Sequence, residues 1–202
     1  ARRPAAATLC TRRPLEWRVL NQVSLGNDRV LAGLLRRSRW RLRLTRRWET
    51  QMPGLLAQLG EHLQVSRSYL FQNFEDASSG ELCARQRFEW VDAGVGAEID
   101  NPELQASSYH DIGCAHWITP LSSGVPVVET IGQASGATAE LMAAQGIKAL
   151  MVAPLISGSR WWGFLGVDDC AVERTWRDAE RKLLMGIGAQ VGQLLHRRAP
   201  KA

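Results

Sequence analysis

The spacing of hydrophobic residues predicts an amphipathic helix over residues 48–63. Apolar side chains recur there every three or four positions, while Glu49, Gln58 and Glu61 fall between them, the pattern of a helix with one buried face. Pro53 fits within the first turn, where its missing N–H breaks no hydrogen bond. A weaker apolar pattern over Val19–Leu44, interrupted by Gly26, favours a further helix.

Alternating and continuous apolar runs predict two pairs of strands. Ser66–Phe74 is rich in aromatic residues, and Ala84–Val91 alternates, placing Gln86, Phe88 and Trp90 on one face. The short connection between these strands favours antiparallel pairing. Ala149–Ile156 is apolar throughout and predicts a strand covered on both faces. It is joined to Arg160–Asp169 by Ser-Gly-Ser, which indicates a hairpin.

A long apolar stripe predicts a C-terminal helix from about residue 172 to 198. It contains Gly186, Gly188 and Gly192, and each glycine costs about 1 kcal/mol of helix propensity relative to alanine. Close packing must compensate, either against the chain's own sheet or against a partner helix in a dimer.

The region between the two strand pairs mixes short elements. Asn101-Pro102 starts a short helix through Leu104, Pro126–Glu129 suits a short strand, and Ala137–Gln145 suits a helix that ends at Gly146. The order of helix, two strands, irregular helical crossover, two strands and helix predicts an α+β sheet with helices grouped by face.

Charge divides the chain into two parts. Its 202 residues carry a net charge of +5, but residues 1–48 hold 13 arginines against two acidic residues, a net of +11, and the rest has a net of −6. We therefore divide the chain into an Arg-rich leader or linker over 1–45, a folded domain over 46–198 and a tail over 199–202. The cluster Arg36–Arg47 suits phosphate binding, but no DNA-reading motif accompanies it, so we favour a solvated linker and expect no nucleic-acid partner.

The remaining composition is that of an ordinary globular protein. No apolar run approaches the ~18 residues of a membrane helix, so we expect no membrane span. Four cysteines lie far apart without a C-x-x-C pair, and no secretory signal is visible, so we expect a reducing cytoplasm.

Two clusters carry possible chemistry. His110, Cys114 and His116 have metal-ligand residue types but lack a fourth ligand at fixed spacing, so we expect a structural or pocket-lining role and no metal site. Asp168 and Asp169 follow a predicted strand, where such a pair forms a ligand site or, more often, a turn or helix cap.

Several motifs in a fixed order resemble a bacterial GAF domain. They are Gln86-Arg-Phe-Glu-Trp-Val91, Gln145-Gly-Ile-Lys148, Val152-Ala-Pro-Leu155 and Trp162-Gly-Phe-Leu-Gly-Val-Asp-Asp-Cys170. The resemblance covers about residues 46–198 and is strongest to GAF modules found with PAS, histidine-kinase, GGDEF and EAL modules.

The resemblance implies a PAS-related antiparallel sheet of about six strands, with terminal helices on one face and a ligand pocket under the crossover on the other. It also implies a parallel homodimer formed by the terminal helices, whose candidate residues are Leu55, Leu59, Leu183, Ile187, Val191 and Leu194. The candidate pocket residues, which are equally suited to an ordinary core, are Trp90, Tyr109, Cys114, His116, Trp117 and Trp162.

The sequence departs from GAF domains with known ligands. The Asn-Lys-Phe/Tyr-Asp-Glu signature of the cyclic-nucleotide class is missing, and Ala137–Gln145 has neither the cysteine nor the histidine of the bilin class. We therefore expect neither cofactor, nor haem or zinc, and leave the ligand unknown.

These inferences favour a sensory module without catalytic residues, which binds a small ligand or partner and relays through dimeric helices to a histidine kinase or diguanylate cyclase. Two alternatives stay open. One is a thiol redox enzyme of the methionine-sulfoxide reductase kind, using Cys83 and Cys170. The other is a dimerisation spacer without a ligand.

Overall fold

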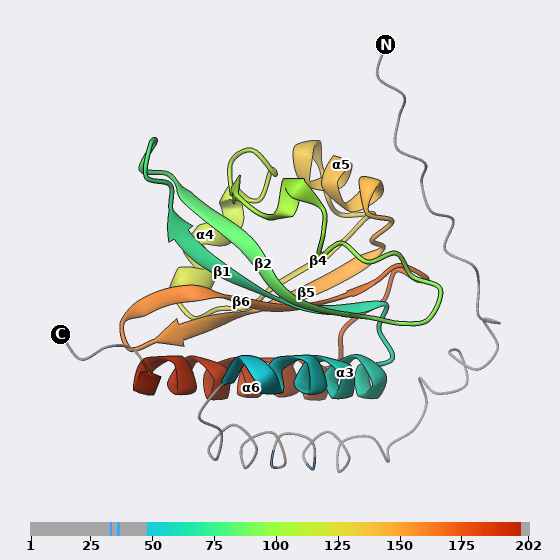
Figure 1. Ribbon diagram of the computed structural model, residues 1–202. Helices are drawn as coiled ribbons and strands as arrows, with labels where there is room; N and C mark the ends of the chain where they lie inside the picture. Colours follow the sequence, from blue (N-terminus) through green and yellow to red (C-terminus); the bar gives the residue numbers. More distant parts are fainter. Residues whose placement is uncertain (1–32, 34–35, 37–47, 199–202) are drawn as a thin grey trace.

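A single antiparallel sheet organises the molecule (Figure 1). The computed structural model describes residues 33, 36 and 48–198. The six strands lie in the order β3-β2-β1-β6-β5-β4, which confirms the predicted fold class and both predicted strand pairs. The strands are β1 (Arg67–Glu75), β2 (Leu82–Val91), β3 (Ser107–Ser108), β4 (Val127–Thr130), β5 (Ala149–Ser157) and β6 (Arg160–Asp169).

Two helices cover one face of the sheet (Figure 1). The first predicted helix is present as a 3-10 turn, η2 (Trp48–Gln51), that continues into α3 (Met52–Leu63), with Pro53 in its first turn. The last helix, α6 (Asp178–Arg198), packs mainly on β5. A Cβ added at Gly192 would lie 2.3 Å from the Ile156 carbonyl oxygen, so this glycine compensates for its low propensity by close approach to the sheet.

The predicted apolar stripes of α3 and α6 are buried in the core of their own chain. Each of the six dimer candidates is at most 6% exposed and belongs to one cluster with the sheet. Of the two kinds of packing that the glycines of the last helix had left open, the stripe therefore makes the one against the chain's own sheet. The residues concerned are Leu55, Leu59, Leu183, Ile187, Val191 and Leu194.

The other face of the sheet is covered by the crossover between β2 and β5. The crossover includes the predicted short helix η3 (Pro102–Leu104), β4, and α5 (Gly136–Ala144). The sequence analysis missed η4 (Ala115–Trp117) and α4 (Ile118–Ser122), because five-residue and three-residue helices are too short to show a hydrophobic period.

Helix α6 begins at Asp178 rather than near residue 172. Asp169 Oδ1 accepts hydrogen bonds from the N–H groups of Ala171 and Val172 at 2.8 and 3.0 Å, which turns the chain away from the strand. Glu180 Oε2 accepts from the Arg177 N–H at 2.8 Å, so this carboxylate caps the new helix in its first turn.

The helix expected over Val19–Leu44 and the cluster Arg36–Arg47 fall almost wholly outside the described residues, so both remain predictions. Within the part of the chain that the structure describes, no helix combines the length and the apolar character that crossing a bilayer requires.

Candidate functional site

A cavity of about 50 Å³ lies between the sheet and the crossover. Its floor is formed by residues of β1, β2, β5 and β6, and its roof by residues between Leu104 and Ile147. Most of the lining is apolar, but the charged side chains of the lining and one amide lie around one part of the cavity. They are Arg67, Gln86, Glu89, Glu98 and Asp168.

A bulge in β2 places two of these polar side chains on the cavity face. Leu70 pairs with Phe88, whereas the next residue, Phe71, pairs with Gln86. Arg87 is therefore the extra residue of β2, without a paired residue in β1. The extra residue reverses the faces of the positions that follow it.

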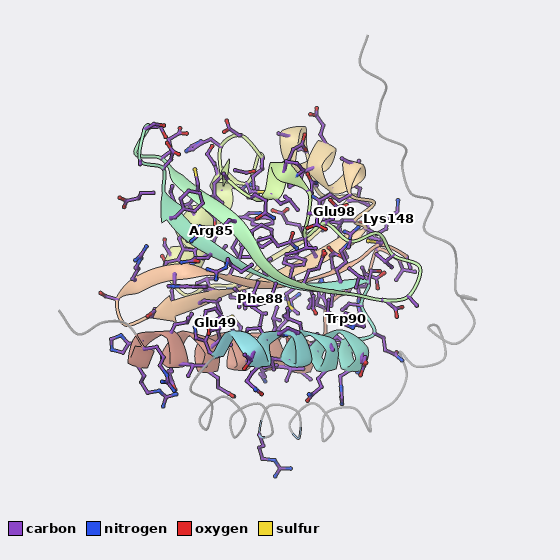
Figure 2. The ribbon with its side chains drawn as sticks, in the orientation of Figure 1. Glu49, Arg85, Phe88, Trp90, Glu98 and Lys148 are labelled. Atoms are coloured by element: carbon purple, nitrogen blue, oxygen red, sulfur yellow. The ribbon has the colours of Figure 1, made fainter. Side chains whose placement is uncertain are left out.

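The bulge changes the predicted alternation of β2. Gln86 and Glu89 line the cavity. Phe88 and Trp90, which are labelled in Figure 2, instead pack against the cluster under α3 and α6. The sequence analysis had placed Gln86, Phe88 and Trp90 on one face, because a bulge leaves no local signal in a strand pattern.

Arg67 joins the sheet to the crossover at the polar part of the cavity. Its Nη1 donates to Asp168 Oδ2 at 3.3 Å, Nε donates to the Gly96 carbonyl at 3.0 Å, and Nη2 donates to the Gln145 carbonyl at 3.0 Å. The same Nη2 lies 3.8 Å from Glu98 Oε1. The Arg67 side chain is 5% exposed, so its charge is neutralised within the protein.

Glu89 is anchored by only one of its two oxygens. Oε2 accepts from the N–H groups of Glu98 and Ile99 at 2.8 and 2.9 Å. Glu89 Oε1 and Gln86 Oε1 are buried and have no hydrogen-bond partner in the described structure. A buried acceptor without a donor costs about 1–3 kcal/mol, so these two atoms mark where a donor would be favourable.

The carboxyl groups of the cavity have displaced pKa values. Burial raises the pKa of Asp168 to about 7, although Arg67 acts in the opposite direction. Burial also raises the pKa of Glu89, although the N–H groups of Glu98 and Ile99, the Arg67 charge and the nearby Gln86 amide act in the opposite direction. Both shifts have the same cause: low solvation disfavours the charged carboxylate.

The predicted pocket residues divide between three places. Cys114 and Trp117 line the cavity. Tyr109 belongs to the same apolar cluster, and its hydroxyl donates to Asn73 Oδ1 at 2.8 Å. Trp90 and Trp162 lie on the opposite face of the sheet, against the α3 and α6 layer, so the cavity does not include them.

His116 lies at a second hollow, of about 340 Å³, beside β4 and the start of α5. Its Nε2 is 2.5 Å from Glu129 Oε1, which also accepts from Trp117 Nε1 at 2.9 Å. His116 and Trp117 therefore share one carboxylate oxygen of Glu129, which connects the second hollow to the roof of the cavity. Among the described residues, no group of three or more His, Cys, Asp or Glu side chains is arranged to hold a metal ion.

The sequence analysis missed Arg67, Gln86, Glu89 and Glu98 as site residues. The available signal was the presence of charged and amide side chains in otherwise apolar strands, since such groups are seldom buried without a partner or role. Asp168 and Asp169, which were noted, have separate roles. Asp168 lines the cavity, whereas Asp169 forms the turn before α6.

Comparisons with known proteins agree with this architecture. The profile of the GAF domain family matches residues 48–195. A curated relative, the methanogenesis regulatory histidine kinase FilI of Methanothrix harundinacea, is 33% identical over 138 residues, which are 68% of this chain. The chain spans only 15% of that relative's length.

Solved structures of low sequence identity share the fold. The phycoerythrobilin-bound GAF domain of a cyanobacterial phytochrome has a TM-score of 0.67 at 18% identity, covering 87% of this chain and 97% of that one. The biliverdin-bound far-red protein JSC1_58120g3 has a TM-score of 0.66 at 16% identity, covering 81% and 98%. The PixJ GAF domain of Thermosynechococcus elongatus has a TM-score of 0.59 at 16% identity, covering 87% and 90%.

These neighbours correct the cofactor prediction. The sequence analysis set the chain apart from the bilin class because Ala137–Gln145 lacks cysteine and histidine. That prediction was wrong, since GAF domains with bound biliverdin and phycoerythrobilin are among its structural neighbours. A fold persists through extensive side-chain replacement, so one missing local motif does not separate ligand classes within it.

Proposed function

The chain belongs to the GAF domain family, and from this premise we propose that it is the sensory module of a larger signalling protein. In this proposal a small molecule binds in the cavity between sheet and crossover, and its presence changes how α3 and α6 are held. The output domain would be a histidine kinase, as in the relative FilI, or a diguanylate cyclase.

The observation that carries the proposal is a continuous set of contacts from the cavity to the ends of both helices. Asp168 lines the cavity, and the next residue, Asp169, places Oδ2 3.6 Å from Arg174 Nη1. Arg174 also donates to the Leu63 carbonyl at the end of α3, at 3.1 Å, and to Glu180 Oε1 in the first turn of α6, at 2.8 Å.

This arrangement gives a ligand a physical means of biasing the helices. A molecule that rearranges Arg67 and Asp168 shifts the end of β6, and Arg174 connects that end to both helices. A ligand shifts a conformational equilibrium only by its difference in affinity between the two states. We expect the ligand to bind one position of Asp168 better than another.

The thiol redox alternative has less support. Burial raises the pKa of Cys114 and of Cys170 to about 12, and a thiol with such a pKa is a poor source of the nucleophilic thiolate. Cys83 is also buried, and its pKa is raised for the same reason. We therefore propose a binding role rather than catalysis, in a reducing cytoplasm.

A homodimer is part of the proposal, but its interface would not be the apolar stripe that the sequence predicted. That stripe is buried against the sheet, so a dimer would use the outward faces of the helices, which include Glu61, Lys182 and Gln193. Light scattering at tens of micromolar tests this: a monomer would remove the dimer from the proposal while leaving ligand binding intact.

The ligand proposal is tested by native mass spectrometry after incubation with a small-molecule extract of the source cells. We expect a bound mass, and hydrogen exchange should slow at the cavity, at the end of α3 and at the start of α6. In Arg174→Ala the change at the cavity should persist and the change in the helices should vanish, whereas Arg160→Ala, at an exposed hairpin, should retain both. No bound mass and no exchange change would favour the spacer without a ligand.

A further inference from the structure

The polar part of the cavity has more acidic groups than basic ones. Three carboxyl groups, those of Glu89, Glu98 and Asp168, face one guanidinium, that of Arg67. Arg67 is the one basic side chain that lines the cavity within the described residues. Each of its three nitrogens already donates one hydrogen bond, to Asp168, Gly96 or Gln145, so its charge is directed to groups of the protein.

The unsatisfied atoms at this place are acceptors. Glu89 Oε1 and Gln86 Oε1 both lack a donor, and the Gln86 side chain is 4% exposed. Hydrogen bonds between a carboxylate and a charged N–H donor are about twice as strong as neutral ones. The chemistry that completes this site therefore brings N–H donors and positive charge.

The size of the cavity limits what can enter. A dry cavity of about 150 Å³ binds benzene, so about 50 Å³ suits a head group of only a few non-hydrogen atoms. Phe71, Leu104 and Ile112 line the neighbouring wall, so the rest of the molecule must be short and apolar.

We propose that the cavity binds a small organic cation, an amine, amidine or guanidine on a short apolar body, with its N–H groups donating to Glu89 Oε1 and Gln86 Oε1. This inference rests on the proposed function, because it concerns the same cavity, and it adds the chemical class of the ligand. The raised pKa of Glu89 agrees with it, since a bound cation relieves the unfavourable burial of that carboxylate.

Three probes of the same shape test the charge preference. Acetamidinium, acetamide and acetate each have four non-hydrogen atoms and differ in charge and donors. Titrations are followed by NMR at the Gln86 and Glu89 amides and at the Gln86 side-chain amide. We expect acetamidinium to bind roughly tenfold more tightly than acetamide, and acetate to show no saturable shift up to about 50 mM.

Glu89→Gln keeps the shape of the side chain and removes its charge. It should weaken acetamidinium binding roughly tenfold and leave acetamide nearly unchanged. Glu81→Gln, a matched change at an exposed position of the turn before β2, should alter neither. The comparison of the three probes on the unmodified chain decides the question even if Glu89→Gln does not fold.

The outcomes separate the ligand class from the proposed function. Acetate binding as tightly as acetamidinium would overturn the cationic class and leave a ligand-binding module. Failure of all three probes, with a bound mass still found from the cell extract, would have the same meaning. Failure of both the probes and the extract would overturn the two proposals together.

Discussion

The two faces of the sheet are built from the same strands and differ in what covers them. On the helix face, α3 and α6 close a continuous apolar cluster in which Met52, Leu59, Leu184 and Ile187 are completely inaccessible. On the crossover face, short helices and turns leave a cavity whose lining includes charged and amide side chains. Long helices pack their side chains regularly, whereas irregular segments do not, so the first face suits stability and the second suits binding.

The largest expected contrast is in the cost of truncating a side chain on each face. Ile187→Ala removes a fully buried side chain between α6 and the sheet and should lower the free energy of unfolding by about 3–4 kcal/mol. Leu141→Ala, at a half-buried position that already borders the cavity, should cost about 1 kcal/mol. Urea unfolding followed by tryptophan fluorescence measures both, and equal losses would mean that the faces are packed alike.

The crossover face should also make stability depend on pH. The pKa of Asp168 is raised from 3.8 to about 7, so between these values the folded chain holds a proton that the unfolded chain has released. Stability should therefore fall as the pH rises, by about 2–3 kcal/mol between pH 5 and pH 8.

Asp168→Asn provides the control for this pH dependence. The amide does not titrate, so the loss of stability between pH 5 and pH 8 should shrink markedly in urea titrations repeated at each pH. Asp76 lies on an exposed turn, and Asp76→Asn should leave the slope over this range as it is. An unchanged slope in Asp168→Asn would assign the pH dependence to another group.

The close packing of α6 on the sheet should also leave no space for an added methyl group. In Gly192→Ala the new Cβ would approach the Ile156 carbonyl to 2.3 Å, and moving α6 away from β5 should cost about 2 kcal/mol. Gly54→Ala in α3 adds a methyl group with nothing within 4 Å and should instead stabilise by about 0.5–1 kcal/mol through helix propensity. Thermal unfolding compares the stability of the two variants. Stabilisation by both would show that α6 can accommodate an additional methyl group against β5.

The smallest effect concerns the polar contacts that hold the cavity roof. Trp117→Phe removes the hydrogen bond to Glu129 Oε1 and should cost about 1 kcal/mol. Trp161→Phe is the matched change, because the buried Trp161 Nε1 has no partner in the described structure, so stability should be unchanged or slightly higher. Similar losses in the two variants would attribute the effect to ring size rather than to the hydrogen bond.

The sequence predicted the helix face well because its signals are local and repeated. The periodicity of residues 48–63 predicted α3, and the glycines of the last helix indicated the close packing that Gly192 makes with β5. The crossover face was predicted less well. Trp90 and Trp162 suited a pocket wall by residue type, but they lie on the helix face.

What the sequence by itself determined is the fold class, the family and the elements with a long hydrophobic period, since each depends on many residues that agree. Only the tertiary structure decided which face of β2 each residue occupies, because the bulge at Arg87 reverses the alternation without a local signal. It also decided that Arg67, Glu89, Glu98 and Asp168 meet at one cavity. These residues lie up to 101 positions apart, and their proximity follows from strand order and from the crossover folding back over the sheet.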